Sequence, residues 1–337
     1  MIHDELPGVE LHNVVETEPA DWADGGHALR RVPRSVRENV NVDARERYRH
    51  PSGSELRFVP TDDGPVEVTL SGAAPTVVYP FWGPFQPDEP VEIGPEPTTL
   101  SLSVPEQVAD LRDDVPTGPF DRRVCRVRFD GWEPAAVHDV SGARRPPESG
   151  EVPDRRLLAY GTSITEGAAA SARHITYTAR LGRSLGADVL NLGASGSAFC
   201  EPAIGEYVAE RGDWDVATLA ISVNMANRGF TDEQFARRAD RIVNEVAAAD
   251  PDRPVVAVTL FPYHDDLVAG EDPDRAATFR EAVRTAVAES PHDNLHHVSG
   301  PDLMDATGLT TDVLHPGDAG HTDIADGLAD AIGELLD

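Results

Sequence analysis

The stretch "LLAYGTSITEGAAA", Leu157 to Ala170, changes character in the middle. A short apolar run ends at Gly161, and small and hydroxylated residues follow before helical periodicity returns. An apolar run of this length is typical of a buried strand, and a glycine at its end lets the chain turn tightly. The stretch therefore predicts a strand whose carboxyl end presents Ser163.

Further apolar runs alternate with helical patterns up to the C-terminus. The apolar runs "ADVLNLG", "DVATLAIS" and "PVVAVTLF" follow, separated by the helical patterns "YTARLGRSLG", "TDEQFARRADRIVNEVAAA" and "PDRAATFREAVRTAVAES". In the second helical pattern, Thr231 and Gln234 have the spacing of a capping box. Alternating strands and helices predict an open α/β domain with a parallel sheet over residues 155–337.

Residues 1–145 follow a different pattern. They contain short alternating or β-branched runs bounded by proline and glycine: "ELRFVP", "VEVTLSG", "TVVYPF", "TTLSLSV" and "RRVCRVRFDG". Regularly spaced short strands predict an all-β, jelly-roll-like sandwich domain. Residues 146–154 are rich in proline, glycine and charge, and we interpret them as a linker.

The charge of the chain restricts its partners. The net charge is −30, the sequence pI is about 4.6, and all 29 basic residues are arginine. A surface with this much negative charge repels phosphate backbones and anionic lipid. We therefore expect no nucleic-acid and no membrane partner. The composition is typical of the solvated acidic shell of halophilic proteins. Recruitment of a cationic partner is the other reading, and no localised acidic run supports it.

Neither a metal nor another cofactor is expected. Cys125 and Cys200 lie far apart and are interpreted as reduced core thiols, and no His/Cys/Asp set has the spacing of a zinc site. The N-terminal "MIHDELPGVE" lacks the features of a signal peptide, and no window has the length of a membrane span. We therefore expect a cytoplasmic protein, with its oligomeric state left open.

The ends of the expected parallel strands carry polar residues. Ser163 follows the first strand, "NLGASG" brings Gly196 after the second, and "ISVNMAN" brings Asn224 after the third. Near the C-terminus, "TDVLHPGDAGH" places Asp312 three residues before His315. Each residue alone fits a turn, a helix cap or a surface position. Together, at the edge where open α/β sheets bind ligands, they supply the parts of an activated nucleophile and an oxyanion hole.

These blocks resemble the SGNH, or GDSL-type, hydrolase superfamily over roughly residues 155–337. The resemblance implies a three-layer, flavodoxin-like catalytic domain. It implies Ser163 as the nucleophile, His315 as the general base and Asp312 as the residue that orients the histidine. It further implies an oxyanion hole made by the backbone N–H groups of Ser163 and Gly196 and the side-chain amide of Asn224.

Two positions depart from the family pattern. Thr162 stands where the family name has aspartate, and Ser222 and Met225 replace the glycine and the aspartate of the family's Gly-x-Asn-Asp block. The leading sandwich together with "GTSIT" further resembles a subgroup of two-domain esterases and acyltransferases, which includes enzymes that deacetylate carbohydrates.

Two further residues are candidates for substrate binding. His174 lies in the segment entering the first long helix and is a candidate to line the pocket. Trp82, in "VVYPFWGPF", either is a buried hinge contact or stacks on a sugar or covers the acyl site. The remaining histidines near the strand ends and in the last helix are expected to be structural or solvent-facing: His264, His296, His297 and His321.

The expected function is a serine esterase that forms an acyl-enzyme and cleaves a small-molecule ester, a short acyl group on a polar, sugar-like alcohol such as an acetylated carbohydrate. An acyltransferase with the same site, or a non-catalytic carbohydrate- or partner-binding protein on this fold, are the alternatives. A nucleotide-binding domain is disfavoured, since Gly193 and Gly196 lack the G-x-G-x-x-G spacing and Asp213 and Asp215 precede the next strand.

Overall fold

The protein, as a computed structural model, forms two compact units. The first holds Met1–Pro33 and Tyr48–Asp154, and the second holds Arg34–Arg47 and Arg155–Asp337. The structure describes residues 6–336, so the first half of the stretch in which no signal peptide is expected lies outside it. Sequence reasoning assigns residues 34–47 to the sandwich, whereas the structure groups them with the α/β unit.

The first unit is built from two antiparallel sheets. One has the strand order β1 (Glu10–His12), β4 (Glu55–Pro60), β9 (Cys125–Phe129), β6 (Thr76–Trp82) and β7 (Val91–Ile93), with β11 (Arg144–Arg145) also on β4. The other has the order β2 (Glu16–Pro19), β3 (His27–Arg30), β10 (Ala135–Ser141), β5 (Val66–Gly72) and β8 (Thr98–Leu102). The short helix α3 (Glu106–Ala109) follows β8. All five runs read as strands in this half form strands.

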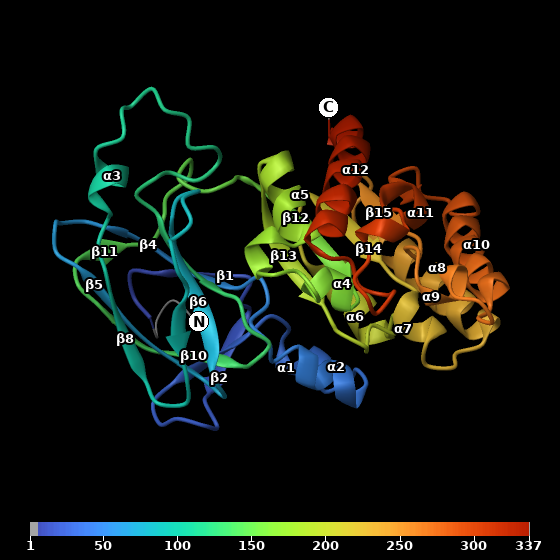
Figure 1. The fold of residues 1–337 in the computed structure, drawn as a ribbon, viewed down its shortest axis with the longest axis horizontal. Helices are drawn as coiled ribbons and strands as arrows, with labels where there is room; N and C mark the ends of the chain where they lie inside the picture. The colour runs from blue at the N-terminus through green and yellow to red at the C-terminus, as the bar shows by residue number, and fades with distance from the viewer. Residues whose placement is uncertain (1–5, 337) are drawn as a thin grey trace. The chain divides into compact units, whose positions relative to one another are not determined.

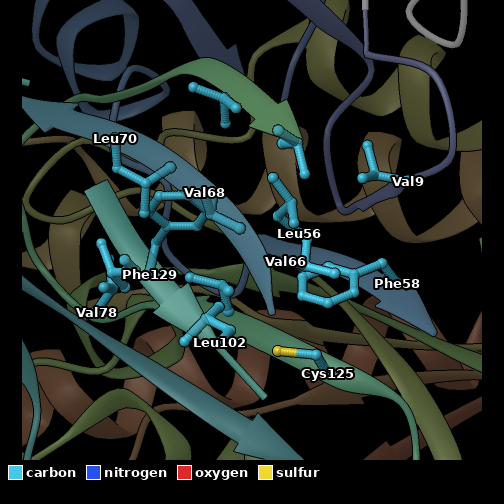
Figure 2. Packing of buried hydrophobic residues seen from close by; sticks show 14 of the residues in the cluster. Val9, Leu56, Phe58, Val66, Val68, Leu70, Val78, Leu102, Cys125 and Phe129 are labelled. Atoms are coloured by element: carbon cyan, nitrogen blue, oxygen red, sulfur yellow. The ribbon is translucent and has the colours of Figure 1, made fainter. Parts of the chain in front are cut away.

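The two sheets share one hydrophobic core, shown in Figure 2. In β5, Val66, Val68 and Leu70 are fully buried, while Glu67 and Thr69 between them are partly exposed. This alternation is what a strand with one face in the core requires. Cys125 lies in the same core, and both cysteines of the chain are buried and free, as the sequence predicts.

Trp82 belongs to this core. Its ring packs edge-to-face on Phe58 with the centroids 6.4 Å apart, and only 6% of the residue is exposed. A side chain so enclosed offers no free ring face on which a sugar could stack. The structure thus supports the buried reading of Trp82 and removes the stacking role.

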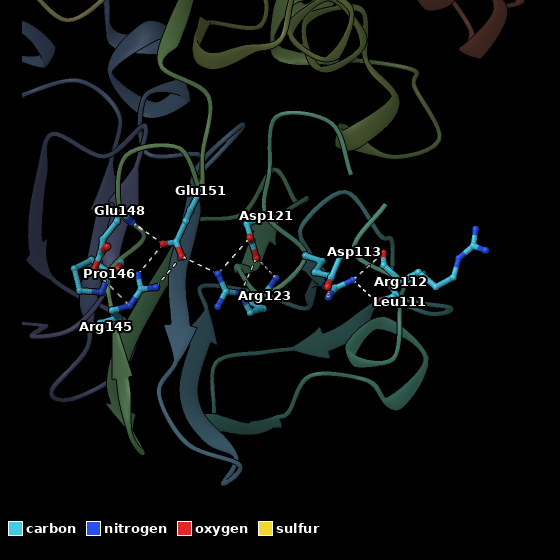
Figure 3. A network of polar contacts seen from close by, with 10 residues as sticks. Leu111, Arg112, Asp113, Asp121, Arg123, Arg145, Pro146, Glu148 and Glu151 are labelled. Atoms are coloured by element: carbon cyan, nitrogen blue, oxygen red, sulfur yellow. Dashed lines mark hydrogen bonds and ion pairs between the residues drawn. The ribbon is translucent and has the colours of Figure 1, made fainter. Parts of the chain in front are cut away.

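The segment 146–154 is anchored to the first unit by a polar network, shown in Figure 3. Arg145 donates two hydrogen bonds of 2.7 Å to the Glu151 carboxylate, and Arg123 connects Glu151 to Asp121. The bonds from Arg145 hold the pKa of Glu151 below its ordinary value. Bonds of this kind fix the end of the segment before the chain enters the second unit.

The second unit contains a five-stranded parallel sheet. Its order is β13 (Ala187–Gly193), β12 (Arg155–Gly161), β14 (Val216–Ala220), β15 (Val255–Val258) and β16 (Leu295–Val298). In chain order this is 2-1-3-4-5, the flavodoxin-like arrangement, as expected. The first four strands are the predicted apolar runs. Strand β16 was not predicted from the sequence, because His296 and His297 interrupt its apolar pattern.

Helices cover both faces of this sheet (Figure 1). Leu157 of β12 shares a hydrophobic cluster with α5 and α12, while Leu158, equally buried, points to the other face. Helix α8 packs between α6 and α10, and the predicted capping box of Thr231 and Gln234 is present at its start. The larger helices are α5 (Tyr177–Leu185), α6 (Pro202–Glu210), α8 (Asp232–Ala249), α10 (Pro273–Ala288) and α12 (Asp318–Leu336). The short ones are α1 (Arg34–Arg37), α2 (Val42–Arg47), α4 (Ser163–Glu166), α7 (Val223–Ala226), α9 (His264–Leu267) and α11 (Gly300–Leu303).

Within residues 6–336, every helix is too short or too polar to cross a lipid bilayer.

Candidate active site

The sheet order places a natural binding crevice between β12 and β14, where the chain reverses its direction of winding. Ser163 comes two residues after β12, and Asn224 comes four residues after β14. Gly196 follows β13, on the other side of β12. The parallel pairing of these strands brings all three residues to the same edge of the sheet.

Ser163, His315 and Asp312 form one hydrogen-bonded chain. The Ser163 Oγ lies 2.8 Å from the His315 Nε2, and the His315 Nδ1 lies 2.7 Å from the Asp312 Oδ2. Since the carboxylate engages Nδ1, the other ring nitrogen is directed at the serine hydroxyl. Val313 between the two side chains has a φ of 54°, so the Asp-x-x-His segment turns tightly enough for both to project the same way.

Asp312 is held in its ionised form. Partial burial raises its pKa, but the hydrogen bonds that it accepts outweigh burial and set the pKa well below its ordinary value. Its Oδ1 accepts bonds from the Thr310 hydroxyl at 2.8 Å and from the backbone N–H groups of Leu314 and His315 at 2.9 Å each. At neutral pH Asp312 is therefore ionised beside the imidazole.

Three N–H donors lie in the turns that follow β12, β13 and β14: the backbone N–H groups of Ser163 and Gly196 and the side-chain amide of Asn224. Gly196 adopts a φ of 68° in its turn, and Asn224 accepts a hydrogen bond on Oδ1 from the Ala198 N–H at 3.1 Å. Since only an oxygen can accept that bond, the Nδ2 donor of Asn224 points the other way. Among residues 6–336, no acceptor engages the Asn224 Nδ2 or the N–H groups of Ser163 and Gly196. These donors are available to a negatively charged oxygen.

The helix that begins at Ser163 is short. Helix α4 is a single turn, capped at its start by Thr162 and ended by Gly167 with a φ of 109°. A single turn carries little of the dipole that a long helix would aim at the site. The backbone N–H at Ser163 itself is what this turn contributes.

Glu166 connects the nucleophile turn to the glycine turn. Its Oε2 accepts hydrogen bonds from the Ser195 N–H at 2.8 Å and from the Ser195 hydroxyl at 2.6 Å, and the residue is fully buried. Sequence reasoning did not select Glu166. The spacing Ser163-x-x-Glu166, which resembles a capping box, is the signal that could have found it.

Two histidines near the site have different surroundings. His174 lies half-buried in the 3₁₀ turn Arg173–Ile175 between α4 and α5, and its role as a pocket residue stays a prediction. His321 is fully buried in α12, where its Nδ1 accepts from the Tyr177 N–H and its Nε2 donates to the Ala168 carbonyl, both at 3.1 Å. Burial lowers the pKa of His321 to about 4, so it is a neutral structural residue.

One group of side chains in the second unit has the residue types of a metal site. Ligand atoms of His264, Asp265 and Glu271 lie within 4.8 Å of one another. The protein already engages both carboxylate oxygens of Asp265, since Tyr263 donates to one at 2.5 Å and the His264 ring contacts the other at 2.6 Å. Both oxygens of Asp265 are thus engaged by neighbouring side chains of the protein.

Ser222 occupies the family's glycine position and has a strained backbone conformation there. Its φ is 124°, a region that side-chain-bearing residues rarely adopt. Its hydroxyl is fully buried and has no hydrogen-bond partner in the described part of the chain. Both features destabilise the turn that leads to Asn224.

We expect Ser222→Gly to raise the free energy of unfolding by about 1–3 kcal/mol, because it relieves the strained φ and removes the unpaired hydroxyl. Denaturant unfolding in molar potassium chloride measures this, with Ser222→Ala as the control that loses the hydroxyl but keeps the strain. A glycine variant no more stable than the wild type would contradict the account.

Comparison with known proteins places this site in a family. The GDSL-like lipase/acylhydrolase family matches residues 154–333, more than half of the chain. No curated protein matches the chain. The chain therefore belongs to the GDSL-like lipase/acylhydrolase family and is a serine hydrolase that acts on ester bonds.

Solved structures share the fold across both units. A salicylyl-acyltransferase, SsfX3, from a tetracycline biosynthetic pathway is 17% identical with a TM-score of 0.79, covering 98% of this chain and 95% of its own. A putative GDSL-like lipase from Bacteroides ovatus ATCC 8483 is 19% identical with a TM-score of 0.72, covering 99% and 96%. A family two carbohydrate esterase from Cellvibrio japonicus is 12% identical with a TM-score of 0.66, covering 98% and 96%.

Proposed function

We propose that the protein cleaves a carboxylic ester through an acyl-enzyme on Ser163. The observation that carries this is the continuous chain from the Ser163 Oγ to the His315 Nε2, 2.8 Å, and from the His315 Nδ1 to the Asp312 carboxylate, 2.7 Å. A serine hydroxyl is a weak nucleophile until a base accepts its proton, and the imidazole lies within reach to do so.

The steps follow from the geometry. Ser163 Oγ forms a bond to the ester carbonyl carbon while His315 Nε2 takes the hydroxyl proton, and Asp312 stabilises the imidazolium. The resulting oxyanion accepts hydrogen bonds from the free donors of Ser163, Gly196 and Asn224. His315 returns its proton to the leaving alcohol as the carbon–oxygen bond breaks. A water then forms a bond to the acyl carbon as His315 takes its proton. The bond between this carbon and the Ser163 Oγ breaks, His315 returns the proton to the Ser163 Oγ, and the acyl group leaves as a carboxylic acid.

We propose a short acyl group on a polar, sugar-like alcohol as the substrate. Carbohydrate esterases are among the proteins that share the fold of both units, which supports this choice. Transfer to an acceptor hydroxyl instead of water is the second candidate, favoured by the likeness in fold to the salicylyl-acyltransferase.

An organophosphate tests the nucleophile without depending on the natural substrate. Diethyl p-nitrophenyl phosphate should release one equivalent of nitrophenolate per chain and leave a diethylphosphoryl group on Ser163, detected by intact mass and peptide mapping. Ser163→Ala should take no label, whereas Ser149→Ala, which removes an exposed serine of the first unit, should label like the wild type. Equal labelling of folded Ser163→Ala and wild type would refute the nucleophile and favour a binding protein.

Adding an alcohol separates the two acyl acceptors. With p-nitrophenyl acetate as donor and cellobiose in excess, a hydrolase yields acetate, and an acyltransferase yields acetylated sugar. Mass spectrometry of the products measures the ratio.

A further inference from the structure

The segment Arg34–Arg47, which comes from the N-terminal half of the sequence, binds the turn that carries Gly196. Asn41 caps α2 by accepting from the Ala44 N–H at 3.0 Å, and its own Nδ2 donates to the Ser197 carbonyl at 2.9 Å. Arg47, at the end of α2, donates from Nε to the Ser195 carbonyl at 3.2 Å. The carbonyls on both sides of Gly196 are thus held from the same segment.

The contact with Arg47 falls on the peptide group that contains the Gly196 N–H. The Ser195 carbonyl and the Gly196 N–H are the two ends of one planar peptide unit, and the described chain contains only trans peptide bonds. In a trans unit the carbonyl and the N–H point in opposite directions. Whatever fixes the Ser195 oxygen therefore fixes the direction of the Gly196 N–H.

Charge acts on the same peptide unit. The guanidinium of Arg47 is a charged donor, so its bond to the Ser195 oxygen is stronger than a neutral one and polarises the unit. Polarisation makes the N–H at the far end a better donor to an anion. On the preceding peptide, Glu166 accepts from the Ser195 N–H. Ser195 is held by the Glu166 carboxyl group on its amide and by the Arg47 guanidinium on its carbonyl.

A glycine turn without these contacts would have freedom to rotate. Gly196 has a φ of 68°, and a Cβ built there would meet only the Arg228 Nη2, at 3.5 Å. Neither a side chain nor close packing restricts the peptide on this side. The restriction comes from the hydrogen bonds to the neighbouring carbonyls.

We propose that Arg47 is a positioning residue for the oxyanion hole: it aims and polarises the Gly196 N–H through the Ser195 carbonyl. The inference rests on the proposed function, since it requires an oxyanion at Ser163. It assigns to the N-terminal half of the sequence an indirect part in transition-state stabilisation, through the Ser195–Gly196 peptide group.

The test compares Arg47→Ala and Arg47→Lys with Arg45→Ala. Arg45 lies on the same helix, but its guanidinium binds the carbonyls of Arg37 and Glu38 within the segment. The measurements are kcat and KM for p-nitrophenyl acetate and the inhibition constant of phenylboronic acid, which forms a tetrahedral adduct with an active serine.

Removal of one oxyanion donor costs about 10²–10³-fold in kcat, and a misdirected donor costs less, so we expect Arg47→Ala to lower kcat by about 10- to 100-fold. KM should stay within about two-fold, because the ground-state ester does not need the donor. The boronic acid should bind more weakly by the same factor as kcat. Arg47→Lys, which retains a charged donor, should recover part of the loss, and Arg45→Ala should match the wild type.

The possible outcomes distinguish a failure of this inference from a failure of the proposed esterase function. Unchanged kcat and boronic acid binding in folded Arg47→Ala, with Ser163→Ala inactive, would overturn the inference and leave the function intact. Turnover retained by Ser163→Ala would instead overturn the function. If Arg47→Ala does not fold, Arg47→Gln, too short to reach the carbonyl, decides by the same two measurements.

Discussion

Ser163→Ala is expected to lower kcat for p-nitrophenyl acetate by about 10⁶-fold, the loss found when the serine of a Ser-His-Asp triad is removed. The reason is that the hydroxyl 2.8 Å from the His315 Nε2 is the group that becomes covalently acylated. Stopped-flow and steady-state release of nitrophenolate measure the change, in low and in molar potassium chloride.

Non-additivity provides the control for this prediction. His315→Ala should cost about as much as Ser163→Ala, and the double variant should be no worse than either, because the two residues act as one unit. Losses that multiply in the double variant would show that the two side chains act independently, against the hydrogen-bonded arrangement. Circular dichroism before each assay establishes that the variants are folded.

Asp312→Asn is expected to lower kcat by about 10⁴-fold while leaving the fold intact. The Oδ1 of residue 312 accepts from the Thr310 hydroxyl and the N–H groups of Leu314 and His315, so an asparagine must keep its oxygen there. Its amide nitrogen then faces the His315 Nδ1 and donates to it. The imidazole is forced into the tautomer with the proton on Nε2, which cannot accept from Ser163.

Asp305→Asn is a matched control for this substitution. Asp305 lies in the loop before α12 and also accepts hydrogen bonds from a backbone N–H and a hydroxyl, both of Thr307. It has no histidine partner among those bonds, so kcat should be unchanged. Since hydrogen bonding keeps the pKa of Asp312 well below its ordinary value, an NMR titration of the side-chain carboxyl carbon should show Asp312 still ionised at about pH 4. A tenfold or smaller effect of Asp312→Asn would contradict the tautomer argument.

Much of the fold is readable from the sequence because it is encoded in local periodicity. Buried parallel strands are continuous apolar runs. Strands β13, β14 and β15 lie within the predicted runs, and β12 contains its predicted run and begins two residues earlier, at Arg155. Strand β16 escapes this rule, since it is the last strand of the sheet and tolerates His296 and His297. The family blocks pointed to Ser163, Asp312 and His315, and in the structure these three side chains lie within hydrogen-bonding distance of one another in sequence Ser163–His315–Asp312.

The supporting contacts could not be read in the same way. Glu166 and Arg47 look like ordinary charged residues of short helical patterns, and only the tertiary fold brings each to Ser195. Trp82 shows the reverse case, because an aromatic loop motif gives no indication of whether its ring faces a core or a ligand. Local pattern fixes secondary structure, whereas long-range side-chain contacts depend on how the elements are packed.

The position of Arg47 in the chain has a consequence for biosynthesis. Arg47 and Ser195 are 148 residues apart, and at about 5–20 residues per second the ribosome needs roughly 7–30 seconds to make the intervening chain. During synthesis, the segment Arg34–Arg47 therefore leaves the ribosome before the Ser195 turn that it binds has been translated. For the same reason, a gene fragment that starts at the linker encodes a hydrolase lacking a piece of its own active-site support.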